Sequence, residues 1–439
     1  MERDSMHVLL VGRWGKAHAM ARALSRSDAA TLYAYMDKEN GAIAGLCNGH
    51  MLGSLRDAHA VGAYADSVEA ELAVVSPYLS LSAGVADVLR RQGIPTVGAS
   101  KTCSLLEGDK AFTRMLMRNH GMATVLPDFE VFHDREKALE HIVQRNDDFA
   151  VKPAGVTEGE GVRVMGQQME DTEDAFAYVE ETFEKEIGGL PYIIIEGKIS
   201  GEEFTIQAFV DGEDIVGMPA VRDYKLQGEG EKGLNTPGMG SYSAADHLLP
   251  FLDRETYDEA LTVMRDVLTI MRRQHNAVYQ GFLSGQFMLT DDGLMLLEFN
   301  ARPGDSELLN ITPILETEFL EICRAIADQR LSDLDISFQE KATVCKYVVS
   351  EGFPHPPDSV EVHVNAEKIR ELDGHLFQSC FEVGEQRYEP SPRLFAVAAT
   401  GDGIYEAEQR CEKCLQHITG DGLFHRRDIG TPLLTERYL

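Results

Sequence analysis

The sequence has little positive charge, few cysteines and no long apolar run. Its 41 lysines and arginines stand against 72 aspartates and glutamates, and the net charge of −31 argues against a nucleic-acid partner, whose phosphates need a basic face. No apolar stretch approaches the ~18 residues of a transmembrane helix. The seven cysteines follow no regular framework, and Met1 to Ser5 lead into a strand without a signal peptide, so we expect a cytoplasmic protein.

The length of 439 residues exceeds what one hydrophobic core usually supports, so we expect about three domains of ~100–200 residues each. Residues 1–103 alternate apolar strand runs with helical patterns, which indicates a small parallel α/β domain. Residues 335–439 are rich in strand patterns, with prolines that mark turns. Cys411 and Cys414 lie in a helix-like stretch without a second cysteine pair, which favours a structural role over a metal or redox role.

Residues 293–307 contain the most informative pattern of the chain. An apolar run predicts a buried strand that delivers Glu298 and Asn300 with one residue between them, so both side chains share a face. Two oxygen ligands on a rigid strand suit Mg²⁺, and Arg302 can place a planar charge against a carboxylate or a phosphoryl oxygen. A lone Glu-x-Asn is more often a strand end with solvated side chains, but earlier segments favour the metal site.

Two of those segments supply positive charge and a flexible loop. Residues 107–112 predict the start of a helix that presents Lys110. A strand at 149–153 presents Lys152 and leads into a loop that contains Gly159 and Gly161. Glycines let backbone N–H groups approach phosphates closely. Each segment alone is weak, because a lone lysine on a strand is usually an edge residue and a glycine-rich loop is usually a turn.

Together with predicted strands at 192–196 and 202–205, these segments resemble the ATP-grasp fold. The resemblance implies an α/β (α+β) architecture, with an ATP-grasp domain at 104–334, a mobile lid at about 123–192 and a strand-rich C-terminal domain at 335–439. It also implies that two lysines and the glycine-rich loop contact ATP, that main chain beside one glutamate frames the adenine, and that a second glutamate holds the ribose. These residues are Lys110, Lys152, Gly159, Gly161, Glu196 and Glu203.

The same resemblance implies that Glu298 and Asn300 ligate Mg²⁺ or Mn²⁺. Gln286 lies where many members of the superfamily place another metal-binding acid. We therefore expect ATP and a divalent cation as cofactors.

Motifs along nearly the whole chain are similar to those of the glycinamide ribonucleotide synthetase family, and two of them resemble its archaeal branch in particular. The segments that carry the similarity are 7–12, 93–98, 223–225, 238–243, 300–307 and 424–430, with 32–36 and 344–349 for the archaeal branch. The resemblance implies a ligase that activates glycine as an acyl phosphate and joins it to 5-phosphoribosylamine, with release of ADP and phosphate. Arg302, Lys225 and Asp305 would be the catalytic and substrate-seating residues.

The chain departs from the family pattern mostly at segments expected to bind the amine acceptor. The family's glycine-rich loop with an acid is replaced by residues 12–19, with Trp14 and Ala17, and Tyr78 stands where the family has an acid. Glu160 reverses a positive charge in the glycine-rich loop at 154–161. Further departures are Ser76, Pro237 and Ser306.

Three functions stay open at this point. The first is the family's reaction in purine biosynthesis. The second is a paralogue that joins another amine and acid, and the third is a ligand-binding protein that has lost catalysis. The sequence predicts small-molecule substrates, an amino acid and a phosphorylated amine, for a monomer or a homodimer. It does not fix the acceptor.

Overall fold

The computed structural model describes residues 5–145, 148–157, 161–390 and 393–431. Its first domain is a five-stranded parallel sheet in the order β3-β2-β1-β4-β5. The strands are β1 (Met6–Val11), β2 (Ala30–Met36), β3 (Gly49–Leu52), β4 (Leu72–Val75) and β5 (Thr96–Val97). The helices used below are α1 (Gly15–Leu24), α3 (Ala58–Ser67), α4 (Tyr78–Ser82), α5 (Val85–Arg91) and α12 (Phe319–Ala327).

Strand β1 is buried on both faces. Leu9 and Val11 belong to the core cluster shared with α3 and α5, while Val8 and Leu10 belong to the cluster shared with α1 and α12. Successive strand residues point to opposite faces, so this apolar run can serve two layers of helices. The predicted parallel α/β domain is present in the structure.

The second sheet forms the floor of the central region and is antiparallel in the order β11-β10-β14-β15. It consists of β10 (Glu202–Val210), β11 (Ile215–Gly217), β14 (Gly281–Thr290) and β15 (Gly293–Asn300), and the long helix α10 (Arg254–His275) packs against it. Strands β14 and β15 form a hairpin that turns at Asp291 and Asp292, so β15 is the edge strand of this sheet and its end is paired with β14.

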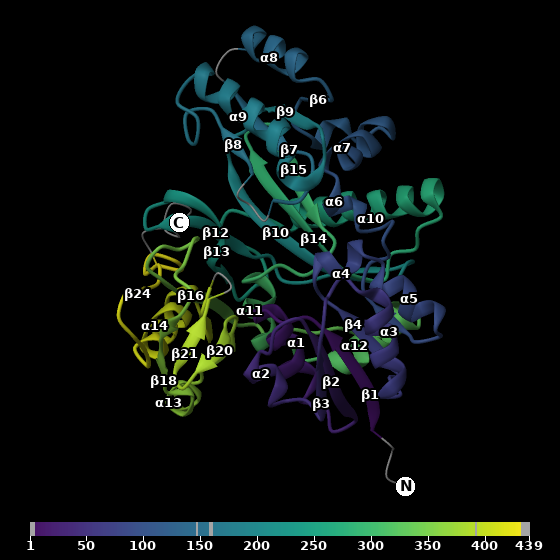
Figure 1. Ribbon diagram of the computed structural model, residues 1–439, viewed down its shortest axis with the longest axis vertical. Helices are drawn as coiled ribbons and strands as arrows, with labels where there is room; N and C mark the ends of the chain where they lie inside the picture. Colours follow the sequence, from purple (N-terminus) through teal and green to yellow (C-terminus); the bar gives the residue numbers. More distant parts are fainter. Residues whose placement is uncertain (1–4, 146–147, 158–160, 391–392, 432–439) are drawn as a thin grey trace.

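A smaller lobe projects at the top of Figure 1 and contains its own sheet in the order β6-β9-β7-β8. Its elements are β6 (Phe129–Phe132), α8 (Arg135–Gln144), β7 (Phe149–Pro153), β8 (Arg163–Val164), α9 (Thr172–Lys185) and β9 (Ile193–Gly197). The lobe has a separate hydrophobic core. It coincides with the predicted lid at 123–192, but its sheet continues to Gly197 because β9 pairs with both β6 and β7. Its mobility stays a prediction.

The C-terminal region is strand-rich, as predicted, and lies at the lower left of Figure 1. Its main sheet has the order β12-β13-β16-β22-β19. The strands are β12 (Arg222–Gly228), β13 (Lys232–Ser243), β16 (Ala342–Ser350), β19 (His375–Gln378) and β22 (Phe395–Gly401). Because β13 pairs with β16, this sheet crosses the predicted boundary near residue 334.

Helix α14 (Ile404–Leu415) covers this sheet and contains Cys411 and Cys414. Both thiols are buried, and Cys411 Sγ lies 3.3 Å from the carbonyl of Val397, which supports a packing role. Within the described ranges no group of three or more His, Cys, Asp or Glu side chains could hold a metal. The helices of the described chain include none that combines the length and apolar character of a membrane span.

Candidate functional site

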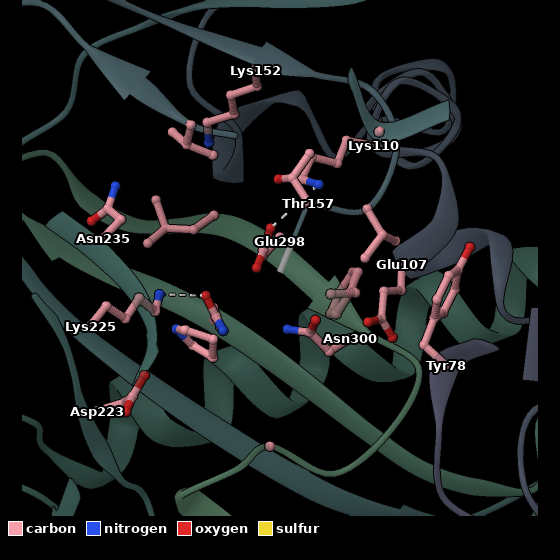
Figure 2. Close-up of a pocket in the computed structure, with 18 of the residues that line it drawn as sticks. Tyr78, Glu107, Lys110, Lys152, Thr157, Asp223, Lys225, Asn235, Glu298 and Asn300 are labelled. Atoms are coloured by element: carbon pink, nitrogen blue, oxygen red, sulfur yellow. Dashed lines mark hydrogen bonds and ion pairs between the residues drawn. The ribbon is translucent and has the colours of Figure 1, made fainter. Parts of the chain in front are cut away.

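A pocket of about 1050 Å³ lies where the three regions meet. Trp14 and Tyr78 line it from the first domain, Lys152 from the small lobe, Glu298 from the central sheet and Arg393 from the C-terminal region. Figure 2 shows Lys110, Lys152 and Glu298 directed into this space, with Asp223 and Lys225 on one side and Tyr78 and Glu107 on the other. The structure therefore brings together residues that the sequence places far apart.

Lys110 is the first residue of α7 (Lys110–Asn119), and Asp109 caps the helix by accepting a hydrogen bond from the backbone N–H of Phe112. The Lys110 ammonium donates to the carbonyl of Gly155 at 2.9 Å and lies 3.9 Å from the Glu298 carboxylate. Burial lowers the pKa of Lys110, and the cationic Lys152 adds to this, although Glu298 opposes it. The lysine thus lies between the glycine-rich loop and the predicted metal ligand.

Lys152 on β7 is buried and forms an ion pair with Glu196 on β9. Arg114, one helical turn after Lys110, pairs with the same carboxylate at 3.1 Å and donates to the carbonyl of Leu297 at 2.7 Å. Burial acts to raise the pKa of Glu196, but Lys152 and Arg114 outweigh it and hold the pKa below its usual value. Sequence reasoning missed Arg114, whose position four residues after Lys110 was the available signal.

Of the loop glycines predicted to contact phosphates, Gly159 lies outside the described residues, as does Glu160. The N–H of Gly161 donates to Thr157 Oγ1 at 3.1 Å, and its carbonyl accepts from the Tyr178 hydroxyl at 2.6 Å. Gly161 is therefore fixed against α9 at the base of the loop.

Glu298 and Asn300 end strand β15 and both line the pocket, as their spacing predicts. Burial acts to raise the pKa of Glu298, but Lys110, Lys225 and Lys152 outweigh it and hold the pKa below its usual value. Among the described residues the Asn300 amide oxygen accepts one hydrogen bond, from Arg302 at 3.3 Å, which leaves a lone pair for a cation. One ionised carboxylate and one amide oxygen fit Mg²⁺, which usually takes few protein ligands and completes its shell with water and phosphate oxygens.

Gln286 on β14 lies opposite Glu298 in the sheet. Its amide oxygen accepts a hydrogen bond from Lys225 at 2.7 Å, and Lys225 also lies 3.3 Å from Glu203. Burial acts to lower the pKa of Lys225, but Glu203, Asp223 and Glu298 raise it overall. Gln286 is thus a weaker candidate for the metal than Glu298, and its metal role stays a prediction.

Arg302 is positioned by a residue that sequence reasoning did not single out. Its Nε lies 2.9 Å from Glu107 Oε1, and Glu107 Oε2 accepts a hydrogen bond from the backbone N–H of Ala301 at 2.8 Å. Glu107 lies in α6 (Leu105–Gly108) and is almost fully buried. The guanidinium is therefore held beside Asn300 by a contact across 195 residues of sequence.

Asp305 connects three separate segments of the chain at the wall of the pocket. Its carboxylate accepts hydrogen bonds from the Tyr347 hydroxyl and, at 3.3 Å, from the backbone N–H of Lys16, and it lies 3.1 Å from Arg393. Arg393 also donates to the carbonyls of Pro237 at 3.1 Å and Asp305 at 3.0 Å. Sequence reasoning missed Tyr347 of β16 and Arg393, which precedes β22, as residues of this site.

The altered segment at 12–19 forms the start of α1, and Trp14 and Tyr78 both line the pocket. The Arg13 guanidinium lies 4.5 Å from the centre of the Trp14 ring and 2.9 Å from Asp37. Ala17 is fully buried. The two aromatic residues predicted from the departures therefore face the site, whereas Ala17 belongs to the core.

The antiparallel central sheet, the small lobe and the lysine-lined pocket between them define an ATP-grasp protein. The chain matches models of three domains of phosphoribosylglycinamide synthetase: the N domain at residues 6–107, the ATP-grasp (A) domain at 108–308 and the C domain at 343–432. The chain belongs to the phosphoribosylglycinamide synthetase family. This confirms the family resemblance and the ATP-grasp architecture predicted from the sequence.

Relatives from two organisms carry the name phosphoribosylamine–glycine ligase. The protein from Methanosarcina barkeri is 40% identical over 433 residues, which cover 98% of this chain and 98% of that protein. The protein from Methanothermobacter thermautotrophicus is 40% identical over 434 residues, again 98% of each chain. The similarity thus extends over whole proteins.

Solved structures support the fold. The crystal structure of phosphoribosylamine–glycine ligase from Thermotoga maritima has a TM-score of 0.80 at 21% identity and covers 97% of this chain and 100% of that one. A biotin carboxylase domain of 2-oxoglutarate carboxylase from Hydrogenobacter thermophilus, solved with MgADP, ADP and bicarbonate, has a TM-score of 0.71 at 15% identity. It covers 98% of this chain and 93% of that one.

Proposed function

We propose that this protein is an ATP-dependent carboxylate–amine ligase that joins glycine to 5-phosphoribosylamine in de novo purine biosynthesis. The family match over all three domains, joined to a pocket in which Lys110, Lys152 and Glu298 converge, carries the proposal. The protein acts on small molecules in the cytoplasm, without a nucleic-acid or membrane partner, as a monomer or homodimer.

The chemistry follows from the weakness of a carboxylate as an electrophile. Transfer of the γ-phosphoryl group of ATP to the glycine carboxylate gives an acyl phosphate and ADP. The amine of phosphoribosylamine then attacks the carbonyl carbon, phosphate leaves, and the amide forms. No covalent bond to the enzyme is needed, so positioning and electrostatic stabilisation carry the catalysis.

The lysines and the metal ligands would act on the phosphates. Glu298 and Asn300 would hold Mg²⁺ or Mn²⁺, with Gln286 as the third ligand, and the bound cation would neutralise charge on phosphoryl oxygens. Lys110 and Lys152 add positive charge from a buried position, where it is screened less than in water.

The remaining predicted residues fit positions around the reacting atoms. Arg302, fixed by Glu107, would stabilise the oxyanion of the attacked carbonyl, and Lys225 would face the carboxylate being activated. Main chain at Glu196 would frame the adenine, and Glu203 would bind the ribose. Asp305 would seat the substrates indirectly, because its carboxylate already holds three loop and sheet partners together.

A paralogue with another amine acceptor is the second candidate, and the exposure of Trp14 and Tyr78 to the pocket favours it. One assay separates the two: phosphate release from ATP, measured across amino acids with and without phosphoribosylamine, with the product identified by mass spectrometry. We expect release that requires both glycine and phosphoribosylamine. Release with glycine and a different amine would support the paralogue, and no release with any pair would reject the ligase.

A further inference from the structure

Strand β12 presents an acid beside the substrate-facing lysine. Asp223 and Lys225 line the pocket, whereas the Tyr224 ring between them is buried 6.2 Å from the ring of Tyr242. The two charged side chains therefore share one face of the strand. Residues two apart on a strand are separated by about 7 Å, a span that one small zwitterion can bridge with a hydrogen bond at each end.

The Asp223 carboxylate has capacity left for a ligand. Its Oδ1 is buried and has no hydrogen-bond partner among the described residues. A buried acceptor without a partner is costly, so such an atom in a pocket wall indicates a bound donor. Gly238 in β13 lies beside this oxygen without a side chain: it has φ +113°, and a Cβ there would lie 3.1 Å from the oxygen.

A second acid faces the same part of the pocket. Glu307, at the start of α11 (Glu307–Ile311), is buried and lines the pocket with Asp223. Burial raises the pKa of Asp223, and the charge of Glu307 adds to this; burial likewise raises the pKa of Glu307, helped by Asp305. Two carboxylates that destabilise each other's charge become more stable when a cation lies between them.

Lys225 offers the opposite charge. An ammonium group has three N–H donors, and two of them face Gln286 at 2.7 Å and Glu203 at 3.3 Å. The third remains for a substrate oxygen. The face thus presents a cation and an anion in the arrangement that a free amino acid requires.

We infer that Asp223 and Glu307 bind the α-ammonium group of the amino-acid substrate, while Lys225 faces its carboxylate. The inference rests on the proposed function and names the residues that would select an amino acid over a simple carboxylic acid. Figure 2 shows Asp223 and Lys225 across the pocket from Tyr78, so the amino acid and the acceptor would approach from different sides.

The test compares glycine with acetate, which has the carboxylate but no ammonium group. Hydroxylamine traps either acyl phosphate by attacking its carbonyl and releasing phosphate, so the acyl hydroxamate reports activation without phosphoribosylamine. For Asp223→Asn we expect the ratio of kcat/KM for glycine to that for acetate to fall by about 100-fold, mainly through KM for glycine. Glu307→Gln should lower the ratio by about 10-fold, and the exposed Asp258→Asn is the matched control.

Each other outcome rejects part of the scheme. Equal losses for glycine and acetate in both variants would overturn the ammonium site, as would a raised KM for phosphoribosylamine with unchanged glycine KM, which would assign the acids to the acceptor amine. If Asp223→Asn fails to fold in a thermal melt, Glu307→Gln carries the test alone. A parent enzyme that activates no amino acid would reject the proposed function as well, whereas a parent that uses glycine and variants that keep its selectivity would reject only this site.

Discussion

The predicted nucleotide side and the predicted acceptor side of the pocket are built in different ways. On the nucleotide side, Lys110 and Arg114 come from one helix, and Lys152 and Glu196 come from neighbouring strands of one lobe. On the acceptor side the parts come from distant segments of all three regions. These are 12–19, Tyr78, Asp305, Tyr347 and Arg393.

Buried charged side chains have different structural roles on the two sides. Around Glu196 one buried carboxylate pairs with both Lys152 and Arg114, so the predicted nucleotide side contains a buried ion-pair network. Around Asp305 the ion pair with Arg393 connects separate segments of the chain, since Arg393 also donates to two main-chain carbonyls of β13, at residues 237 and 238. We therefore expect substitutions on the nucleotide side to affect ATP turnover most, and substitutions on the acceptor side to affect stability or amine use.

The largest effect should come from Glu298→Gln. The change removes the ionised carboxylate of the predicted metal site but keeps the volume of the side chain, so ATP turnover should fall by about 10²–10³-fold while the fold stays intact. ADP release at saturating Mg²⁺ measures the first effect and thermal melting the second. The exposed Asp292→Asn, on the turn before the same strand, is the control. Turnover within about threefold of the parent would show that Glu298 is not the metal ligand.

The next effect should come from Lys152→Ala. This change removes a buried positive charge and leaves Glu196 paired with Arg114 alone, so we expect KM for ATP to rise by about 10–100-fold, with slower phosphoryl transfer. Because removing one partner of a buried ion pair is costly, the free energy of unfolding should also fall by about 3 kcal/mol. ATP titration and urea unfolding measure the two effects, with the exposed Lys137→Ala as control.

A companion change, Glu160→Lys, should tighten nucleotide binding by adding positive charge to the phosphate loop. Glu160 lies outside the described residues, so this expectation rests on sequence alone. Unchanged nucleotide affinity in both Lys152→Ala and Glu160→Lys would contradict the view that charge in these two segments binds the phosphates.

Local patterns in the sequence predicted residues that the structure places in the pocket wall. The period of a strand placed Glu298 and Asn300 on one face, and a helix start placed Lys110 in the pocket. The same patterns could not show that Glu196 neutralises Lys152, because that ion pair depends on which strands become neighbours. They also could not show that β13 joins the C-terminal sheet, so the contacts of Asp305 with Tyr347 and Arg393 could not be predicted.

On the predicted acceptor side, one buried histidine should make the free energy of unfolding depend on pH. His18 in α1 is buried and accepts a hydrogen bond from the backbone N–H of Gln378 at 2.9 Å. Burial lowers the pKa of His18 to about 3, and Arg22 adds to this. The unfolded chain, with a pKa near 6.5, binds the proton more readily, so stability is complete above about pH 6.5 and is lost progressively as the pH falls toward 3.

Between pH 6.5 and pH 5 the His18 contribution should fall by about 2 kcal/mol, since each unit is worth about 1.4 kcal/mol. His18→Asn keeps an acceptor for Gln378 but removes the titrating ring, so its unfolding free energy should lose about 2 kcal/mol less than that of the parent over this range. Urea unfolding at the two pH values measures the difference, with the exposed His59→Asn as control. Equal losses in parent and His18→Asn would contradict the assignment.

The smallest effect on catalysis should follow when the family's residues are restored at the predicted acceptor side, as Trp14→Gly, Ala17→Glu and Tyr78→Glu. Ala17 is fully buried, and its Cβ lies 3.0 Å from where a Cβ on Gly12 would be, so glutamate there should lower stability by at least about 2 kcal/mol. The pair Trp14→Gly and Tyr78→Glu is therefore the cleaner variant. Burial raises the pKa of Tyr78, and the nearby charge of Glu107 raises it further. A glutamate at position 78 would therefore lie close to a second negative charge.

If this chain makes glycinamide ribonucleotide, the parent should form that product robustly, and the Trp14→Gly, Tyr78→Glu variant should change its rate by no more than about threefold or lower it. Product formation measured by mass spectrometry at saturating glycine and ATP decides this, with Tyr405→Glu on the exposed face of α14 as control. A parent nearly inactive with phosphoribosylamine, and a variant with clearly higher activity, would instead establish a different amine acceptor. In that case the protein would combine the family's ATP site with an acceptor site for a different amine.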